Sequence, residues 1–392
     1  MSEAIYIVSA TRTPIGAFQG SLSTVPATEL GSAAIKAALE KANVKGEQVS
    51  EVILGQVLQA GVGQAPARQA SLGAGIPNSV PCLTINKVCG SGLKSVMLGF
   101  DMIKLGDADI VVAGGMENMT LSPHMLMNAR AGYRMGPVKS EDCMMRDGLL
   151  SPFDGQHMGN YTELCATEYK FSREEQDEFA KTSYERAQKS LAEGLFKNEL
   201  CTVEVKSRKA TTEVTEDEEP GKARFDKMAT LRPAFDKEGT ITAANASKIN
   251  DGACALVLAS EKAVKEHGLK PLAKIVAHAT YAQDPKWFTT APVGAMKKLF
   301  EKTGKSAEQV DLFEINEAFS AVTMAAMKDL SLDHGKVNIN GGSVALGHPI
   351  GASGARILTT LTHALHTHNK TTGVAAICLG GGEGISMMVE KV

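Results

Sequence analysis

The sequence carries little net charge, contains no close pair of cysteines and has no long hydrophobic run. Its formal net charge is −3 over 392 residues, and the basic residues form no dense cluster. Nucleic acids and anionic membrane surfaces attract proteins through strong positive fields, so partners of both kinds are not expected. No hydrophobic run approaches the roughly 18 residues of a membrane span. Small molecules are therefore the expected partners.

Cysteine is also scarce for so long a chain. The seven cysteines stand at irregular spacings, include no C-x-x-C pair and leave one over from any pairing scheme. This pattern predicts reduced thiols in a reducing compartment. The segment MSEAIYIVSATRTP is predicted to enter a strand within its first few residues, which leaves no room for a signal or transit peptide. We therefore expect a cytoplasmic location.

Glycine, by contrast, is abundant, and the chain repeats itself. The 38 glycines mark many close turns, and strand-like and helix-like segments alternate, which predicts α/β layers. Residues 35–52 align without a gap on residues 296–313, at an offset of 261 residues, and Ser91-Gly92 lies 262 residues before Ser353-Gly354. We therefore predict two copies of one α/β unit, with an insert over about 120–250 between them.

The insert differs in composition from the two copies. Ser172 and Glu175 form a capping-box pattern, which predicts a helix that closes near Gly194. Its methionines are expected to fill core or interface positions. The acidic run TEDEEP, at 215–220, is predicted to be a solvated loop.

One cysteine occupies an unusual turn. In TINKVCGSGLKSVMLGF, at 84–100, a strand-like run reaches Cys89 and then passes through glycines into an amphipathic helix. The first turn of a helix has unpaired N–H groups and a positive dipole end, both of which favour a thiolate. The alternative is a buried cysteine that acts as a small hydrophobe. The neighbouring glycines favour a reactive thiol, because they clear space around the sulfur.

Three further polar residues stand at comparable turns in the second copy. Asn316 follows an apolar strand in EINEAFS, His348 lies in GHPIGASG before a helix, and Cys378 ends a strand in CLGGG. Each of them alone has a structural explanation, as a cap, a surface residue or a core thiol. Together, two thiols, an imidazole and a carboxamide at such turns indicate nucleophilic catalysis.

These motifs carry a family resemblance. NKVCGSG, NEAFS, GHPIGASGAR and CLGGGEG, together with SATRTPIG, VAGGMENM and LRPAF, resemble the thiolase family, and most of all its short-chain members that act on acetoacetyl-CoA. The resemblance implies two βαβαβαββ halves, at 1–120 and 251–392, packed as an αβαβα five-layer sandwich. Residues 121–250 would then form an inserted loop domain for coenzyme A binding and oligomer contacts.

The resemblance also implies a reaction. A short-chain thiolase is an acyltransferase, an acetyl-CoA C-acetyltransferase, which condenses two acetyl-CoA to acetoacetyl-CoA plus coenzyme A, reversibly, through a covalent acetyl-cysteine. No metal or redox cofactor is expected. The alternatives are a broader degradative 3-ketoacyl-CoA thiolase, a β-ketoacyl synthase-type condensing enzyme and a non-catalytic protein of the same fold. Relatives form dimers or tetramers, so a homotetramer built as a dimer of dimers is expected.

By the same resemblance, roles fall on particular residues. Cys89 would be the acylated nucleophile, His348 would lower its pKa, and Cys378 would be the second acid/base. His348 and a water held by Asn316 would form one oxyanion hole, and the N–H groups of Cys89 and Gly380 the other. The bulky pair Trp287-Phe288 and His157 predict a tight acyl pocket. The residues implied to bind the pantetheine arm are Leu149, His157, Met158, Phe235, Ala243, Ser247, Ala318 and Phe319.

Overall fold

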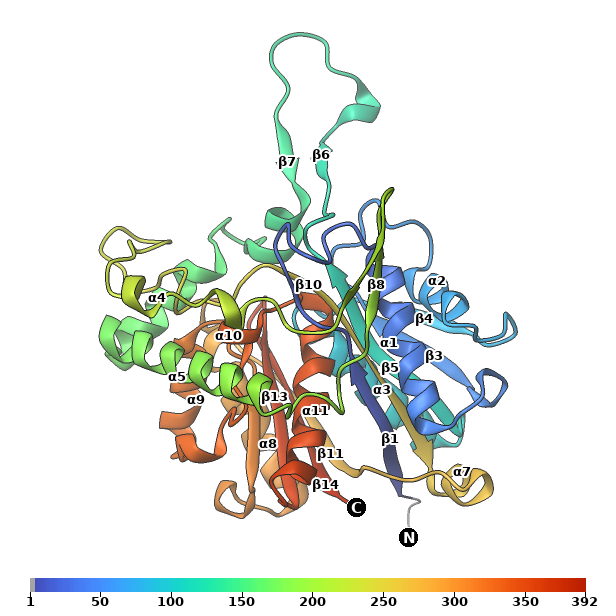
Figure 1. Ribbon diagram of the computed structural model, residues 1–392. Coiled ribbons are helices and arrows are strands. Elements are labelled where there is room, and N and C mark those ends of the chain that lie inside the picture. The colour runs from blue at the N-terminus through green and yellow to red at the C-terminus, as the bar shows by residue number, and fades with distance from the viewer. Residues whose placement is uncertain (1–3) are drawn as a thin grey trace.

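The protein is built around ten strands that pair in one connected sheet, with helices layered on them (Figure 1). This sheet divides into two halves, which are described below as the sheets of two units. The structure is a computed structural model that describes residues 4–392, so the first three residues of the predicted N-terminal half lie outside the described part. The first unit comprises β1 (Ile5–Arg12), β2 (Gly16–Ala17), α1 (Ala27–Ala42), β3 (Glu51–Gly55), α2 (Pro66–Gly73), β4 (Cys82–Ile85), α3 (Ser91–Leu105), β5 (Ile110–Asn118) and β10 (Asn250–Ser260).

The second unit follows after α7 (Glu261–His267). It comprises β11 (Ala273–Ala282), α8 (Ala291–Thr303), β12 (Leu312–Ile315), α9 (Ser320–Leu330), α10 (Ser343–Leu346), α11 (Ile350–Thr367), β13 (Thr372–Leu379) and β14 (Glu383–Lys391). Between β5 and β10 the chain forms β6 (His124–Leu126), β7 (Ser140–Asp142), the π-helix η3 (Met144–Leu149), α4 (Met158–Tyr169), α5 (Arg173–Ala192), β8 (Val203–Lys206), β9 (Thr211–Val214) and α6 (Phe225–Met228). Strand β10 pairs with β1 and β5, and so completes the sheet of the first unit.

The two units share one strand order. The first runs β4-β3-β5-β10-β1 and the second β12-β13-β14-β11, with the same succession of parallel and antiparallel pairs after β3 and β12. A single parallel bridge from Phe313 to Val337 takes the place of β4 in the second unit. Strand β3 begins at Glu51 and β12 at Leu312, which is the offset of 261 residues seen in the sequence. The predicted duplication is therefore confirmed.

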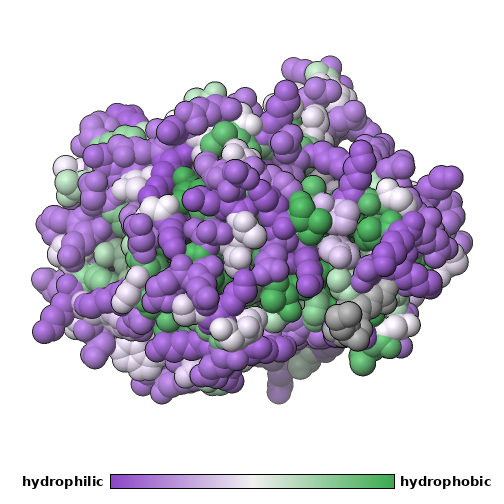
Figure 2. Space-filling view, turned by 90° about the horizontal axis from the view of Figure 1, so that it is seen from below, coloured by the Kyte–Doolittle hydropathy of each residue, from purple (hydrophilic) through white to green (hydrophobic). Residues whose placement is uncertain are grey.

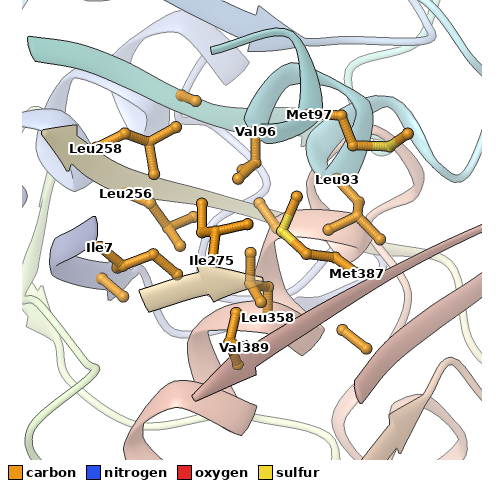
Figure 3. Packing of buried hydrophobic residues seen from close by; sticks show 14 of the residues in the cluster. Ile7, Leu93, Val96, Met97, Leu256, Leu258, Ile275, Leu358, Met387 and Val389 are labelled. Carbon is orange, nitrogen blue, oxygen red and sulfur yellow. The ribbon is translucent and has the colours of Figure 1, made fainter. Parts of the chain in front are cut away.

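The layers follow from where the hydrophobic side chains are buried. Helices α1 and α2 cover one face of the first sheet, and α8 and α9 cover the outer face of the second. Helices α3 and α11 lie between the sheets, where Leu93 and Val96 of α3 meet Leu256 of β10 and Ile275 of β11 (Figure 3). This arrangement is the predicted five-layer sandwich. The sheets also join edge to edge where Tyr6 pairs with Lys274 and Ile7 with Ala273.

The two central helices cross at equivalent glycines. A Cβ added to Gly92 of α3 would lie 2.7 Å from the backbone nitrogen of Ala355, and one added to Gly354 of α11 would lie 2.5 Å from that of Leu93. Such distances leave no room for a side chain at either position. The glycines therefore allow the close approach that brings the starts of both helices, and the turns before them, together.

The insert contains one predicted helix and one long arm. The capping box is confirmed, since Ser172 accepts from the N–H of Glu175 and α5 ends at Ala192. Strands β6 and β7 form an arm that extends from the body (Figure 1), and along it Met127 and Met135 are exposed rather than in the core. Helices α4 and α5 pack against α9 and α10 of the second unit.

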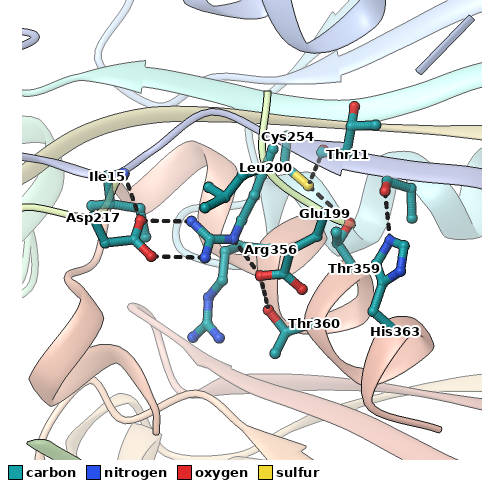
Figure 4. A network of polar contacts seen from close by, with 12 residues as sticks. Thr11, Ile15, Glu199, Leu200, Asp217, Cys254, Arg356, Thr359, Thr360 and His363 are labelled. Carbon is teal, nitrogen blue, oxygen red and sulfur yellow. Dashed lines mark hydrogen bonds and ion pairs between the residues drawn. The ribbon is translucent and has the colours of Figure 1, made fainter. Parts of the chain in front are cut away.

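The acidic run of the insert is only in part the solvated loop that the sequence predicts. Asp217 is buried and binds the guanidinium of Arg12 through two contacts of 2.6 and 2.8 Å, and Glu199 binds the same group at 2.6 Å (Figure 4). Glu218 accepts hydrogen bonds from the backbone of Ala17 and Ser21. Thr215 and Glu216 remain exposed, whereas Asp217 is buried and Glu218 partly buried, because their carboxylates satisfy a buried cation and backbone donors of the first unit.

One face of the molecule is mostly hydrophilic (Figure 2). On the face seen from below in Figure 1, hydrophobic residues lie in small groups among hydrophilic ones (Figure 2). Within residues 4–392, no helix combines the length and hydrophobicity needed to cross a bilayer.

Candidate active site

Cys89 stands at the turn between β4 and α3. The residue before it, Val88, has a φ of 46°, a left-handed conformation that is strained for a β-branched side chain. The turn is held by its neighbours: Asn86 Oδ1 accepts from the N–H of Val88 at 2.9 Å, and Ser91 Oγ accepts from the N–H of Lys87 at 2.8 Å. These bonds keep the cysteine at the helix start, where the sequence predicts it.

A cavity of about 270 Å³ lies beside Cys89. Its lining comes from both units and from the insert, and is mostly hydrophobic. It includes Cys89, His348 and Gly380 of the predicted catalytic residues. Seven of the eight predicted pantetheine-binding residues also line it, namely Leu149, His157, Met158, Phe235, Ser247, Ala318 and Phe319. The structure thus brings together residues separated by more than half of the chain.

The eighth predicted residue, Ala243, lines a hollow that adjoins the cavity. This hollow measures about 430 Å³ and shares Phe235, Ser247 and Lys248 with the cavity. Lys222 and the half-exposed ring of Phe18 line it further out. A ligand with a long arm and a charged end would fit this sequence of spaces, with its reactive end at Cys89.

His348 presents one ring nitrogen to a neighbour and keeps the other free of protein partners. Its Nδ1 lies 2.6 Å from Ser353 Oγ, which itself donates to the carbonyl of Pro349 at 2.9 Å. Because the Ser353 hydrogen is used there, Ser353 accepts from Nδ1–H. Nε2 is buried and has no hydrogen-bond partner among residues 4–392. The imidazole can therefore accept a proton at Nε2.

Cys378 and Asn316 lie behind the cavity wall. Cys378 is buried in one cluster with Phe288, Ala318 and Phe319, three residues that line the cavity. A charge on Cys89 raises the pKa of Cys378, as does burial, which is the larger cause. Asn316 is held through its backbone, since its N–H donates to the carbonyl of Ala376 on β13 at 2.9 Å.

Burial dominates the electrostatics of Cys89. It raises the pKa of Cys89 to about 11, although the N–H groups of Gly380 and of Cys89 itself act in the opposite direction. Burial also lowers the pKa of His348 to about 3. The expectation that the helix start holds a thiolate is thus wrong for this state, because desolvation outweighs the dipole. The cavity contains a neutral thiol and a neutral imidazole.

The three residues that predict a tight acyl pocket lie in different places. Phe288 is buried and lines the cavity, whereas Trp287 lines a separate surface hollow with Glu168 and Lys328. Only one member of the bulky pair therefore shapes the cavity. His157 stacks on Phe235 with ring centroids 4.6 Å apart, and its Nδ1 accepts from the N–H of Gly159.

Sequence reasoning missed Glu117, a buried residue whose carboxylate binds backbone groups next to the site. Its carboxylate accepts from the backbone N–H groups of Val57 at 3.0 Å, Leu58 at 3.2 Å and Gly351 at 2.9 Å. It therefore ties the start of α11, next to His348, to the loop after β3. Burial raises its pKa to about 7. A charged residue directly after the apolar run 110–116 of strand β5 is the signal that could have found it.

The fold and the site define a thiolase-like acyl-transfer architecture: two fused α/β units whose glycine turns place one thiol and an imidazole in the wall of a cavity and a second thiol behind that wall. The family models for the thiolase N-terminal domain and C-terminal domain match residues 5–262 and 269–391. The chain belongs to the thiolase family.

Individual relatives are similar over their whole length. An acetyl-CoA acetyltransferase of Schizosaccharomyces pombe is 51% identical over 390 residues, covering 99% of both chains. A protein of Gibberella zeae named as a cytosolic acetyl-CoA acetyltransferase is 49% identical, covering 99% of this chain and 98% of its own. The crystal structure of Acat5 thiolase from Ascaris suum in complex with coenzyme A superposes with a TM-score of 0.94 at 43% identity, over all of both chains.

Proposed function

We propose that this chain is an acetyl-CoA C-acetyltransferase. It would condense two acetyl-CoA to acetoacetyl-CoA and coenzyme A, and would catalyse thiolysis in reverse, without a metal or redox cofactor. The observation that carries the proposal is the convergence of Cys89, His348 and Gly380 on one cavity with Cys378 directly behind it. Relatives about half identical over their full length bear the same activity in their names.

In the first half-reaction Cys89 acts as the nucleophile. His348 Nε2 accepts the thiol proton, and the sulfur attacks the thioester carbonyl of acetyl-CoA. The developing oxyanion accepts hydrogen bonds from the N–H groups of Cys89 and Gly380, the same groups that stabilise a charge on the sulfur. Coenzyme A leaves as its thiol, taking back the proton from His348, and the acetyl group stays on Cys89.

In the second half-reaction Cys378 acts as the base. Its own thiol proton first passes to His348 Nε2, and the thiolate then removes a proton from the α-carbon of a second acetyl-CoA. The resulting carbanion attacks the acetyl group, the bond to Cys89 breaks, and His348 returns its proton to the Cys89 sulfur. A base with a raised pKa suits so weak a carbon acid, and burial raises that of Cys378. The enolate oxygen is held by His348, whose Nε2 carries the proton at this stage, and by a water bound to Asn316. A β-ketoacyl synthase-type reaction is disfavoured because the second thiol occupies this place.

The proposed acyl-enzyme can be detected directly. Because Cys89 alone among the cysteines lines the cavity of the described chain, brief incubation with acetyl-CoA is expected to acetylate Cys89 and neither Cys82 nor Cys378. Peptide mass analysis after rapid acid quenching measures this. An acetyl group on another cysteine would reject the assignment.

Substrate size distinguishes the short-chain activity from a broader degradative one. The ring of Phe288 closes the cavity near the thiols, so acetoacetyl-CoA is expected to be cleaved much faster than 3-ketohexanoyl-CoA. Phe288→Ala should raise kcat/KM for the six-carbon substrate relative to the four-carbon one by about tenfold or more, since each methylene accommodated is worth about 1–3 kcal/mol. Steady-state thiolysis with both substrates measures the ratio.

Trp287→Ala is the matched control for that experiment. It removes the neighbouring ring, which lines the surface hollow and not the cavity, so the ratio should stay at the wild-type value. An unchanged ratio in Phe288→Ala would place Phe288 outside the acyl pocket, and rapid cleavage of 3-ketohexadecanoyl-CoA by the wild type would favour the degradative alternative.

We also propose a cytosolic homotetramer, assembled as a dimer of dimers. Strand β4 stands at the end of the sheet with Leu83 exposed, which suits pairing between two copies. The β6–β7 arm exposes Leu126, Met127 and Met135, which suits contact between dimers. The cytosolic location follows the name of the Gibberella zeae relative. Light scattering in solution tests the number of chains.

A further inference from the structure

A chain of buried hydrogen bonds ends on Asn316. Arg356, on α11, donates from Nη2 to Ser343 Oγ at 2.8 Å, and Ser343 Oγ donates to Asn316 Oδ1 at 2.6 Å. All three side chains are buried. The chain runs from the helix that follows His348 to the turn after β12, and so connects the two turns that carry the predicted oxyanion-hole side chains.

The direction of these bonds is dictated by chemistry. A guanidinium has only donors, so Ser343 Oγ must accept from Arg356. The single hydroxyl hydrogen of Ser343 is then free for its other neighbour, the side chain of Asn316, and that atom must be an acceptor. The arrangement therefore requires that Oδ1 of Asn316, and not Nδ2, faces Ser343. If the amide were turned over, its NH₂ group would face Ser343, and the serine hydrogen would lose its acceptor.

The other end of the amide is left without a protein partner. Asn316 Nδ2 is fully buried, and no group of residues 4–392 accepts from it. Buried amide donors are almost always hydrogen-bonded, so a donor held in this way is suited to a water or substrate oxygen. Among residues 4–392, His348 Nε2 and Arg356 Nε are likewise buried without a protein partner.

Arg356 is itself fixed in place. Its Nη1 lies 3.3 Å from a carboxylate oxygen of Glu314, on the strand that leads to Asn316. Its positive charge polarises the Ser343 hydroxyl, and successive hydrogen bonds of this kind strengthen one another in a buried setting. The amide N–H of Asn316 is thereby made a better donor as well as a correctly oriented one.

We propose that Ser343 and Arg356 are positioning residues for the condensation step. They hold the Asn316 amide so that Oδ1 faces Ser343 and Nδ2 is available to the water that binds the enolate oxygen. This inference rests on the proposed function. It assigns no contact with substrate to either residue. It requires that their effect on the reaction pass through Asn316.

The test separates the two half-reactions. Ser343→Ala removes the hydroxyl that fixes the amide, so the condensation rate should fall by about tenfold to 100-fold. This is less than the roughly 100-fold to 1,000-fold loss that follows removal of an oxyanion-hole donor itself, because the Asn316 amide remains. Acetyl exchange between acetyl-CoA and a second thiol should stay within about twofold of the wild type, because Cys89 and Gly380 serve that step. Ser343→Thr keeps a hydroxyl and should retain most condensation activity.

A double-mutant cycle shows whether Ser343 acts through Asn316. Asn316→Ala should lower condensation, and adding Ser343→Ala to it should cause no further loss. Equal losses from Ser343→Ala with and without Asn316 would overturn the inference, as would full condensation activity in Ser343→Ala. Loss of acetyl exchange as well as condensation in both Ser343 variants would also overturn it.

Ser183→Ala is the matched control. Ser183 is a buried serine next to α10 that donates to Glu317 at 2.7 Å and accepts from the N–H of Gly342 at 3.0 Å, but is not bonded to Asn316. Its loss should leave the condensation rate near that of the wild type. A drop equal to that of Ser343→Ala would make the effect one of packing and reject the inference. A wild-type chain that exchanges no acetyl groups and condenses no acetyl-CoA would instead reject the proposed function itself.

Discussion

Cys378→Ser is expected to abolish most condensation while preserving acetyl exchange between thioesters. The second thiol is proposed to act on the α-carbon of the incoming acetyl-CoA, a step that exchange does not include. Loss of a general base costs typically 100-fold to 10,000-fold, and serine is a far weaker acid than cysteine, so condensation should fall by at least about 100-fold. Exchange of acetyl groups between acetyl-CoA and a labelled coenzyme A measures the first half-reaction alone.

Cys254→Ser provides the control for that variant. Cys254 is also a buried cysteine, but its thiol donates to the carbonyl of Thr11 and lies beside Thr359, among residues outside the cavity. A hydroxyl can make the same bonds, so both activities should remain close to the wild-type values. If Cys378→Ser lost exchange and condensation to the same extent, the division of labour between the two thiols would be wrong.

Asp217→Ala is expected to destabilise the whole chain. It removes the two-point contact with the guanidinium of Arg12, which is buried and, among residues 4–392, retains Glu199 as its one carboxylate partner. Breaking a buried pair in this way costs about 3–5 kcal/mol, because the remaining charge is left without compensation. The free energy of unfolding, measured by urea denaturation with circular dichroism, should fall accordingly.

The exposed pair of Arg224 and Asp226 serves as the comparison. Both side chains are mostly exposed, and exposed pairs of this kind contribute little because solvent screens them. Asp226→Ala should therefore leave the unfolding midpoint close to that of the wild type. A similar small effect in Asp217→Ala would show that the buried network does not hold the insert to the first unit.

Much of the fold could be predicted because it is repeated. The offset of 261 residues places β3 on β12, and the capping box at Ser172 specifies α5 locally. The burial of Asp217 could not be predicted in the same way, since its partner Arg12 is about 200 residues distant in the chain. Acidic runs are usually solvated, and only the tertiary structure supplies a buried cation to reverse that tendency.

The residues of the site could be predicted from the sequence, but their protonation and the direction of their side chains could not. Cys89 and His348 were found from glycine turns, yet the pKa of Cys89 depends on how completely the cavity walls exclude water. Trp287 and Phe288 are adjacent in the sequence but face different hollows. Ser343 and Arg356 gave no separate signal, because their importance lies in the direction of two hydrogen bonds.

The crossing of α3 and α11 has an evolutionary meaning. In a symmetric pair of identical chains, the residue on the twofold axis meets its own copy, so one glycine per chain would suffice for this contact. Gly92 and Gly354 are equivalent positions of the two units, and they make this close contact within a single chain. An ancestral half-length protein would have formed the same crossing as a homodimer, with two identical sites. Fusion would then free the halves to diverge, so that one turn could carry Cys89, the proposed nucleophile, and the other His348, its proposed proton acceptor.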